Sequence, residues 1–492
     1  MHMYTYISLL LLVSPLVSGW VPVTPPYCSR SMEERHIPPL SSSDSHKVSG
    51  LLQTQVFIRH GARTPYTSHP CWRHYNILWN NCNVTEFMFA SPSRTAEEES
   101  MWFFRKLYDG SPNMLGGNCL TGQLISEGYD QEMANGKILR EAYFGEGPLK
   151  VANSSRWEDL NISKIYFRSD DEQRTLMSGQ ILVHSLFDIP HREIIDWHTG
   201  DYSIDTLYPN AVACPALKKI AAEAFASEGF ASGQQTRNVD ELEAVLDSAL
   251  GEGHWSWRYL LDCFMTTACT GRPIPREDQY GSVVLTQQIF DRSIEYMEFV
   301  YAYMSLYDGA RYSKLSMSNT AYRTRERLWG AIRGDDSALK FVLYAGHDTT
   351  LSALLAALLG DKWDGRWPPY AAMLSFELYS PREEDQEHLV RVVYNGIPLV
   401  MPGCDTALCN ASSVMRLLEF ASPGIPAECT TPENLPGQTS DSNHFNTADW
   451  ILITVFCSLL SAVFGAILYM LVSNSGAAKS RVPYTHIPNT SL

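Results

Sequence analysis

The chain has 492 residues, of which 45% are hydrophobic, and its formal net charge is −16 at pH 7. A hydrophobic share of this size is that of a globular protein, so the composition excludes a largely disordered chain. Nucleic acids are bound by basic surfaces, so the acidic balance argues against them as partners. The length accommodates two or three ordinary domains, or one large domain with insertions.

The first residues have the pattern of a secretory signal. Ile7 to Val17 form an apolar stretch of signal-peptide length, and the small residues Ser18 and Gly19 follow it. A positively charged start is missing, which departs from the usual pattern. We assign residues 1–19 to a signal peptide. Residues 20–50 are rich in Pro and Ser without a clear period and form an N-terminal extension.

Three later segments share one order: a short apolar strand, a break with basic or polar residues, and a helical pattern. The first is QVFIRHGARTP (residues 55–65), the second spans residues 164–187, and the third spans residues 340–360. In the third segment leucines recur at helical spacing, and Asp348 and Thr349 are residue types that favour a helix N-terminus. Strands followed directly by helices predict an α/β fold with a parallel-rich central sheet flanked by helices.

The breaks after these strands bring together charged residues. They are, in chain order, Arg59, His60, Arg63, Arg168, His347 and Asp348. Ligands of a parallel sheet bind beyond the carboxyl ends of its strands, where helix N-termini add N–H donors and partial positive charge. The constellation predicts a phosphate site that needs no metal and no cofactor. An ion pair of Arg168 with Asp170 or Asp171 is the alternative for that arginine, and Arg174 is interpreted as structural.

The long intervals 66–120 and 196–335 contain helical patterns and many aromatic residues. They predict insertions that form a mainly helical cap domain within one ectodomain of residues 51–431. Residues 432–449 are polar and rich in turn formers, which predicts a flexible stalk.

Trp450 to Val472 is a stretch of 23 residues without a charge, long enough to cross a bilayer as one helix. Lys479 and Arg481 follow it, so residues 473–492 are expected in the cytosol and the bulk of the chain on the other side. The sequence therefore predicts a single-pass type I membrane protein. The sequons of the ectodomain are Asn83, Asn153, Asn161 and Asn410.

The cysteines agree with an oxidising compartment. Of 11 cysteines, Cys457 lies in the expected membrane helix, which leaves ten, an even number, outside it. Cys404 and Cys409 lie close together in CDTALC, and in such a compartment a local disulfide is favoured over a zinc site.

RHGARTP followed far downstream by GHDTT resembles the histidine acid phosphatases, the branch of the histidine phosphatase superfamily that includes lysosomal and prostatic acid phosphatases. FRSDDEQRTLMSGQ and PPYAAMLSFELY extend the resemblance over residues 51–431. It implies hydrolysis of phosphate monoesters in two steps, with His60 as nucleophile and Asp348 as proton donor. The implied phosphate-binding residues are Arg59, Arg63, Arg168 and His347.

The resemblance also implies a set of disulfides and a cellular location. Cys214 is expected to pair with Cys429. Met373 replaces a cysteine of the family, so Cys263 and Cys269 are expected to pair with each other. The four remaining cysteines, for which two bridges are left open, are Cys28, Cys71, Cys82 and Cys119. Tyr484 to Ile487 (YTHI) resembles the endocytic and lysosomal sorting signal of lysosomal acid phosphatase, which predicts adaptor binding and a lysosomal, endosomal or cell-surface location.

The same motifs permit alternatives. One is a phytase-like enzyme, or a phosphatase acting on a phosphorylated sugar of a glycan. A rival is a catalytically silent receptor ectodomain on the same fold, but it predicts the loss of a catalytic residue, and all six are present. A transferase like phosphoglycerate mutase is disfavoured by the expected membrane anchor and disulfides. The expected partners are a small phosphate monoester and the bilayer, and a homodimer is compatible with the sequence.

Overall fold

The computed structural model describes most of the expected ectodomain. The described residues are 19–20, 28, 31–67, 69–82, 87–88, 104–105, 115–190, 193–275, 285–383 and 386–430. They belong to the first of two units, whose boundary follows Asn434. The expected stalk, the membrane helix Trp450 to Val472, the sorting signal from Tyr484 to Ile487 and nearly all of the signal peptide lie outside the described residues. Within the described ranges no helix has the length and apolar character to span a bilayer.

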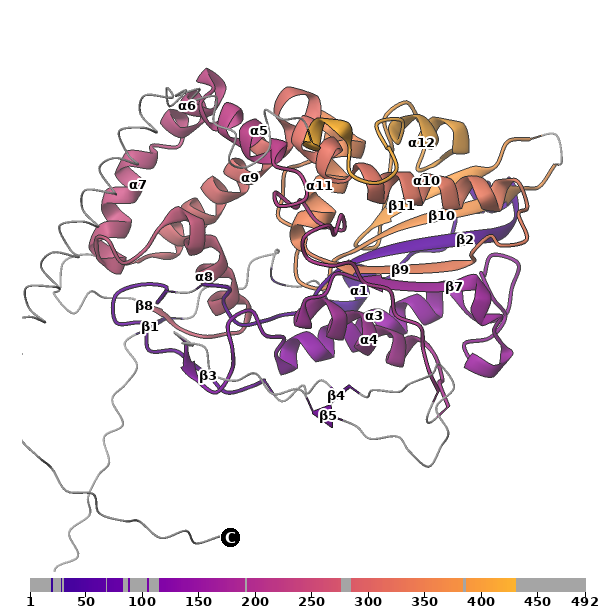
Figure 1. The fold of residues 1–492 in the computed structure, drawn as a ribbon, viewed down its shortest axis with the longest axis horizontal. Helices are drawn as coiled ribbons and strands as arrows, with labels where there is room; N and C mark the ends of the chain where they lie inside the picture. Colours follow the sequence, from indigo (N-terminus) through magenta and orange to yellow (C-terminus); the bar gives the residue numbers. More distant parts are fainter. Residues whose placement is uncertain are drawn as a thin grey trace, which may run out of the picture. The chain divides into compact units, whose positions relative to one another are not determined.

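A mixed sheet forms the centre of the described unit, in the order β12-β11-β10-β2-β9-β7, with β13 also on β11 (Figure 1). β2 (Val48–Arg59) lies in the middle and pairs in parallel with β9 (Phe341–Gly346). β7 (Ile165–Ser169) extends this parallel half on the other side of β9. These three strands are the ones expected from the sequence.

The other half of the sheet is antiparallel, so the prediction of a parallel-rich sheet is wrong. Its strands are β10 (Met373–Pro381), β11 (Leu389–Tyr394), β12 (Ile397–Leu399) and β13 (Leu408–Asn410). The reason is local for two of the pairs, because β10 and β11, and then β11 and β12, are consecutive strands joined by short connections as hairpins. Asn395 and Gly396, with φ of 46° and 78°, form the two-residue turn between β11 and β12.

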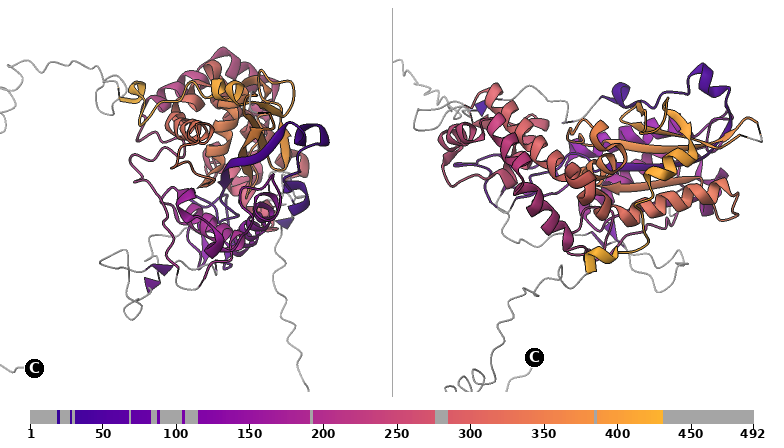
Figure 2. Two further views of the ribbon diagram at one scale, coloured as in Figure 1. Left: turned by 90° about the vertical axis from the view of Figure 1, so that its right-hand side faces the viewer. Right: turned by 90° about the horizontal axis from the view of Figure 1, so that it is seen from above.

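Helices cover both faces of the sheet (Figures 1 and 2). One face packs against α3 (Ser126–Tyr143) and α4 (Gln173–Leu186), and the other against α10 (Ser318–Ile332), α11 (Asp348–Leu359) and α12 (Ala411–Leu417). Alternation along β2 separates the two cores: Val56 and Ile58 lie on the α3 and α4 side, and Phe57 lies on the α11 side. Both faces of the central strands are therefore buried, which explains their near-continuous apolar sequence.

A cap of helices lies beyond one end of the sheet (Figures 1 and 2). It contains α5 (Ala216–Phe225), α6 (Glu228–Thr236), α7 (Val239–Leu246), α8 (Trp257–Cys269) and the first part of α9 (Gln287–Ser316), which is kinked at residues 307–310. This confirms a mainly helical cap. These helices lie within the expected interval 196–335, whose last helix, α10, packs instead against β2 of the sheet.

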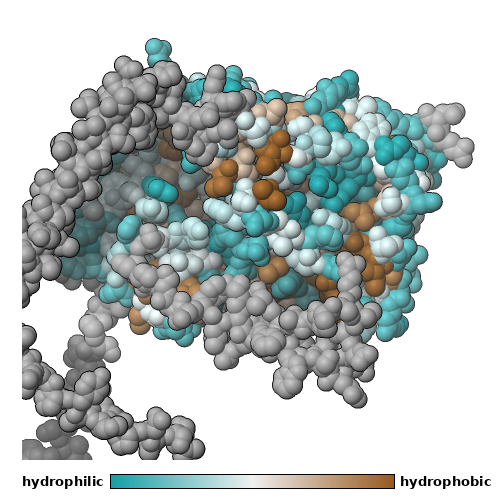
Figure 3. Space-filling view, viewed as in Figure 1, coloured by the Kyte–Doolittle hydropathy of each residue, from teal (hydrophilic) through white to brown (hydrophobic). Residues whose placement is uncertain are grey.

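The remaining elements are short. They are α1 (Met32–Arg35), α2 (Ser42–Ser45), and the strand pairs β1 (Gly19–Trp20) with β8 (Ile274–Pro275), β3 (Leu78–Trp79) with β6 (Gly116–Gly117), and β4 (Phe87–Met88) with β5 (Phe104–Arg105). The described face in Figure 3 is mostly hydrophilic, with hydrophobic side chains in scattered small groups. Asn153, Asn161 and Asn410 are exposed, as a glycosylated residue must be, and Asn83 lies outside the described residues.

Five disulfides join the ten cysteines outside the expected membrane helix. The pairs are Cys28–Cys269, Cys71–Cys263, Cys82–Cys119, Cys214–Cys429 and Cys404–Cys409. The last two confirm the expected pairs. The expected bridge between Cys263 and Cys269 is wrong: both lie on α8, where six residues correspond to about 9 Å along the axis and to different sides of the helix.

Candidate active site

The loop that follows β2 is held close to the start of α3. A Cβ atom on Gly61 would lie 2.4 Å from the carbonyl oxygen of Gly128, and one on Gly128 would lie 2.3 Å from that of Ala62. No larger residue fits at either place. The Gly61 N–H donates to Ser178 Oγ (3.1 Å), and Ile125 N–H donates to the Ala62 carbonyl (3.1 Å). The backbone around His60 is therefore fixed from two helices.

His60 is buried, with 1% of its surface exposed, and its ring has a defined tautomer. Nδ1 lies 2.8 Å from the carbonyl oxygen of Gly61, which can only accept, so Nδ1 carries the proton. Nε2 then keeps its lone pair. Burial, followed by the charges of Arg174, Arg59 and Arg63, lowers the pKa of His60 well below its ordinary value. This imidazole stays neutral, and nucleophilic, in acid.

The buried Arg59, at the end of β2, and the partly buried Asp348, just after β9, form an ion pair. Arg59 NH2 lies 2.7 Å from Asp348 Oδ2, and its NH1 donates to the Pro368 carbonyl at 2.7 Å. The Arg59 guanidinium also stacks on Tyr370, 4.0 Å from the ring centroid. Burial alone would raise the pKa of Asp348, but Arg59, Arg63 and His347 outweigh it and hold that pKa below its ordinary value. Asp348 is therefore a carboxylate in the ligand-free site.

Arg63 is bound by the cap. Its NH1 lies 2.7 Å from Oδ1 of Asp262 on α8, and Oδ2 of Asp262 accepts the Tyr66 N–H at 2.5 Å. One cap carboxylate therefore holds both the arginine and the backbone that follows it. No local sequence pattern points to Asp262, because it lies about 200 residues further along the chain than Arg63.

The structure does not bring Arg168 into this group. Arg168 lies within β7, and its NH2 is paired with the buried Asp205 at 2.8 Å. Arg174, which the sequence interpretation called structural, lies instead on the first turn of α4 and is the strongest of the charges that lower the pKa of His60. A residue inside a strand points to a face of the sheet, whereas the first turn of the next helix faces the ligand edge.

Three buried arginines around His60 have an N–H donor left over. The Nε atoms of Arg59, Arg63 and Arg174 find no hydrogen-bond partner among the described residues. A buried, charged donor without a partner is unfavourable, and an anion with several acceptor oxygens would satisfy all three donors around this imidazole. A phosphate group has that chemistry.

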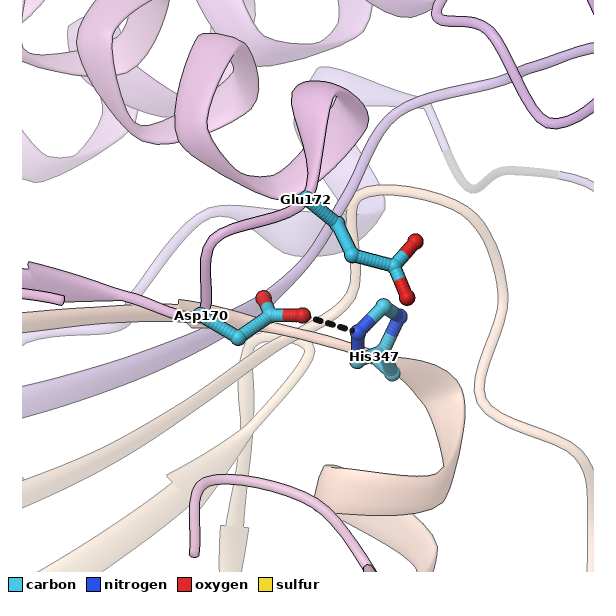
Figure 4. A group of neighbouring side chains, drawn as sticks. All are labelled: Asp170, Glu172 and His347. Atoms are coloured by element: carbon cyan, nitrogen blue, oxygen red, sulfur yellow. Dashed lines mark hydrogen bonds and ion pairs between the residues drawn. The ribbon is translucent and has the colours of Figure 1, made fainter. Parts of the chain in front are cut away.

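His347, at the start of α11, lies beside the nucleophile, with ring centroids 5.6 Å apart. Its Nε2 is bonded to Asp170 Oδ2 at 2.8 Å, as Figure 4 shows. Burial alone would raise the pKa of Asp170, but the charge and hydrogen bond of His347 lower it below its ordinary value. His347 is therefore placed in the site as expected, with one ring nitrogen committed to a carboxylate.

Asp170, Glu172 and His347 form a group that could in principle hold a metal ion, since their ligand atoms lie within 4.8 Å of one another (Figure 4). However, Asp170 is bonded to His347, and Glu172 is paired with Arg174. Because both carboxylates have partners and a guanidinium lies next to them, we interpret the group as a hydrogen-bond network that orients His347 and Arg174.

A cavity of about 690 Å³ opens between the sheet end and the cap. Its lining residues are Arg59, Arg63, Tyr66, Thr67, Thr121, Arg258, Tyr259, Leu261, Asp262, Met265, Tyr301, Asp348, Thr349, Trp367 and Tyr370. Arg258, Asp262 and Met265 lie on one face of α8, one helical turn apart. The cap therefore supplies most of the wall opposite the buried arginines.

Comparison with known proteins agrees with this geometry. The sequence profile of the histidine phosphatase superfamily (branch 2) matches residues 50–395. Counting factor 60 of Dictyostelium discoideum is 27% identical over 384 residues, which are 74% of this chain and 84% of that protein. Lysophosphatidic acid phosphatase type 6 of Mus musculus is 26% identical over 429 residues, 82% of this chain and 94% of that protein.

One further relative and one solved structure are also similar to this chain. 2-Phosphoxylose phosphatase 1 of Mus musculus is 27% identical over 394 residues, which are 73% of each chain. Among solved structures, the phytase from Citrobacter braakii has a TM-score of 0.50 at 15% identity and covers 77% of this chain and 99% of that one. At that identity the likeness concerns the fold alone.

Proposed function

Because this chain belongs to branch 2 of the histidine phosphatase superfamily and is a phosphoric monoester hydrolase, we propose that it works through a phosphohistidine on His60. Nε2 attacks phosphorus, and the bond from phosphorus to the leaving oxygen breaks. Water then attacks phosphorus, the P–N bond breaks, and His60 regains its lone pair. Arg59, Arg63 and Arg174 bind the three non-bridging oxygens in both steps.

The proton for the leaving oxygen needs a source, because Asp348 is ionised in the free site. A phosphate monoester loses its second proton with a pKa of about 6, so in more acidic solution it enters as a monoanion that carries a proton. Asp348 would take that proton and give it to the leaving oxygen, and in the second step it would accept a proton from water. His60 stays neutral in the same range. The enzyme is therefore proposed to be an acid phosphatase.

The observation that carries this proposal is the buried His60 with a free Nε2 among three arginines with unused Nε–H donors. The test is to trap the intermediate with a ³²P-labelled aryl phosphate and an alkaline denaturing quench, which preserves phosphohistidine. Peptide mapping is expected to place the label on His60, and His60→Ala is expected to abolish both label and turnover while keeping the melting temperature. Turnover by folded His60→Ala would contradict the proposal.

The cavity favours a ring-shaped leaving group with a single phosphate, such as a phosphorylated sugar. Five of its lining residues are aromatic: Tyr66, Tyr259, Tyr301, Trp367 and Tyr370. Its charged lining consists of three arginines and two aspartates, a balance that suits one phosphate better than a polyphosphorylated inositol. This supports the glycan-sugar alternative over the phytase-like one. A panel of sugar monophosphates, lysophosphatidic acid and inositol hexakisphosphate tests it, and preference for the last would contradict it.

We also propose that the catalytic part of the chain lies in a compartment of the secretory route. All ten cysteines outside the expected membrane helix are paired, which supports an oxidising compartment. The type I anchor, the glycosylation of Asn153, Asn161 and Asn410, and lysosomal sorting through Tyr484 remain proposals. The silent receptor alternative is disfavoured, because His60, Asp348 and the buried arginines lie together.

A further inference from the structure

The N-terminal segment (residues 31–40) lies ahead of the family match and packs against the back of the active site. α1 begins with a capping box between Ser31 and Glu34. Arg35 and Ile37 are buried, with 2% and 5% of their surfaces exposed. A Cβ atom on Gly396 would lie 2.6 Å from the His36 carbonyl oxygen, so the segment sits closely on the turn between β11 and β12. This docking fixes where Arg35 points.

Arg35 and Asn135 both donate a hydrogen bond to the Ala371 carbonyl. Its NH1 donates to the Ala371 carbonyl at 3.2 Å and also to Asn135 Oδ1. Nδ2 of Asn135, from α3, donates to the same Ala371 carbonyl at 3.0 Å and to Glu132 at 2.9 Å. Two buried side chains from elements far apart in sequence therefore converge on one oxygen.

That carbonyl belongs to a residue in an unfavourable conformation. Ala371 has a φ of +56°, in the left-handed region that residues with a Cβ rarely adopt, and it is fully buried. Such a conformation persists only where its surroundings hold it. Here a turn bond from the Ala372 N–H to the Pro369 carbonyl (3.1 Å) fixes the backbone locally, and the hydrogen bonds from Arg35 and Asn135 hold the Ala371 carbonyl.

The loop around Ala371 forms one wall of the active site. The Ala371 N–H donates to the His60 carbonyl at 3.3 Å, and the Arg59 N–H donates to the Ala372 carbonyl at 2.9 Å. The preceding residue, Tyr370, is the ring on which the Arg59 guanidinium stacks. A change in the conformation of Ala371 would therefore move the partners of both the nucleophile and its neighbouring arginine.

We propose that Arg35, which lies outside the part of the chain that matches the family, is a positioning residue for phosphoryl transfer. It holds Ala371 in the left-handed conformation, and that conformation keeps Tyr370 on Arg59 and the backbone of His60 in place. The proposal rests on the proposed function of His60. The N-terminal segment then contributes to catalysis as well as to stability.

The experiment compares Arg35→Ala with Ile37→Ala in the full-length protein. Ile37 is a matched control, because it is buried in the same segment and its aliphatic side chain cannot donate a hydrogen bond to the Ala371 carbonyl. At a temperature where both variants are folded, Arg35→Ala is expected to lower kcat for an aryl phosphate about tenfold, with KM changed less than about threefold. Ile37→Ala is expected to lower the melting temperature and leave kcat unchanged.

Two further variants test the proposed cause. Arg35→Lys keeps a cationic donor and is expected to recover part of kcat. It also gives a usable variant if Arg35→Ala does not fold. In an Ala371→Gly background, Arg35→Ala is expected to lose less activity, because glycine adopts a positive φ without support.

The outcomes separate this inference from the proposed function. An inactive wild-type protein would contradict the phosphatase proposal whatever Arg35 does. An active wild type whose kcat is unchanged by Arg35→Ala, or is lowered equally by Ile37→Ala, would overturn the positioning role alone. Full additivity of Arg35→Ala and Ala371→Gly would also overturn it, since the two residues would then act independently.

Discussion

The two walls of the cavity differ in how their charges are held. At the sheet end, Arg59 and His60 are each 1% exposed and are fixed by neighbouring backbone and side chains. On the cap side, Arg258 of α8 is exposed and has no acidic partner among the described residues. A buried, fixed wall suits the chemistry that all substrates share, and an open wall suits the part that differs between substrates.

Asp348 lies where the two walls meet, and we expect the largest selective effect there. Asp348→Asn removes the group that moves the proton, which matters most for a poor leaving group. We expect kcat to fall roughly a thousandfold for an alkyl phosphate and less than about tenfold for 4-nitrophenyl phosphate. Steady-state kinetics with both substrates measures this. Equal losses would reduce Asp348 to a helix cap and a partner of Arg59.

Substitutions of Arg168 and Arg174, the two arginines of residues 164–187, test the fixed wall. Arg174→Gln removes a phosphate donor and is expected to lower kcat/KM about a hundredfold for all monoesters. Arg168→Gln is the matched control: it is expected to lower the melting temperature, because it leaves the buried Asp205 unpaired, and to change kcat/KM less than about threefold. A larger kinetic loss for Arg168→Gln than for Arg174→Gln would reverse our assignment.

Asp262 joins the walls, because this cap residue holds Arg63 of the phosphate loop. Asp262→Asn weakens both of its bonds, to Arg63 and to the Tyr66 N–H, and we expect kcat/KM to fall about tenfold for all substrates alike. Asp247→Asn is a suitable control, since Asp247 accepts a bond from Trp255 elsewhere in the cap. A loss of kcat/KM confined to one class of leaving group would instead assign Asp262 to the open wall.

The open wall is expected to give the smallest effect. Arg258 lies one turn of α8 before Asp262, about 6 Å further from the phosphate end, where it would meet a second acidic group on a substrate. We expect 4-(carboxymethyl)phenyl phosphate to be preferred over its neutral amide by about threefold to fivefold, and Arg258→Gln to abolish this preference. Arg292→Gln, on α9 outside the cavity, serves as control. A preference that survives Arg258→Gln, or that is insensitive to added salt, would contradict this role.

The sequence predicted features that depend on local contacts better than features that depend on contacts between distant residues. Strand, break and helix are local patterns, so β2, β9 and β7 and the residues Arg59, His60 and Asp348 at their ends were predicted. The antiparallel half had a local signal that the prediction overlooked, the Asn395–Gly396 turn between two apolar strands.

The errors concern contacts that sequence spacing does not determine. Arg168 and Arg174 are six residues apart, and the choice between them depends on where β7 ends, an element boundary that pattern reasoning places poorly. The partners of Cys263 and Cys269 are Cys71 and Cys28, which lie 192 and 241 residues away. Asp262 and Arg35 likewise act on residues remote in sequence, so only the folded path of the cap and of the N-terminal segment reveals them.

The position of β2 in the sheet has a consequence for biosynthesis. This strand is made early, yet both of its neighbours, β9 and β10, begin only at residues 341 and 373. At translation rates of roughly 5–20 residues per second, the apolar strand that ends at Arg59 waits about 15 to 60 s before β9 is complete. During that time it has no native partner and remains a target for aggregation or chaperone binding. Premature termination within the cap would therefore yield a chain that contains the nucleophile and no sheet to hold it.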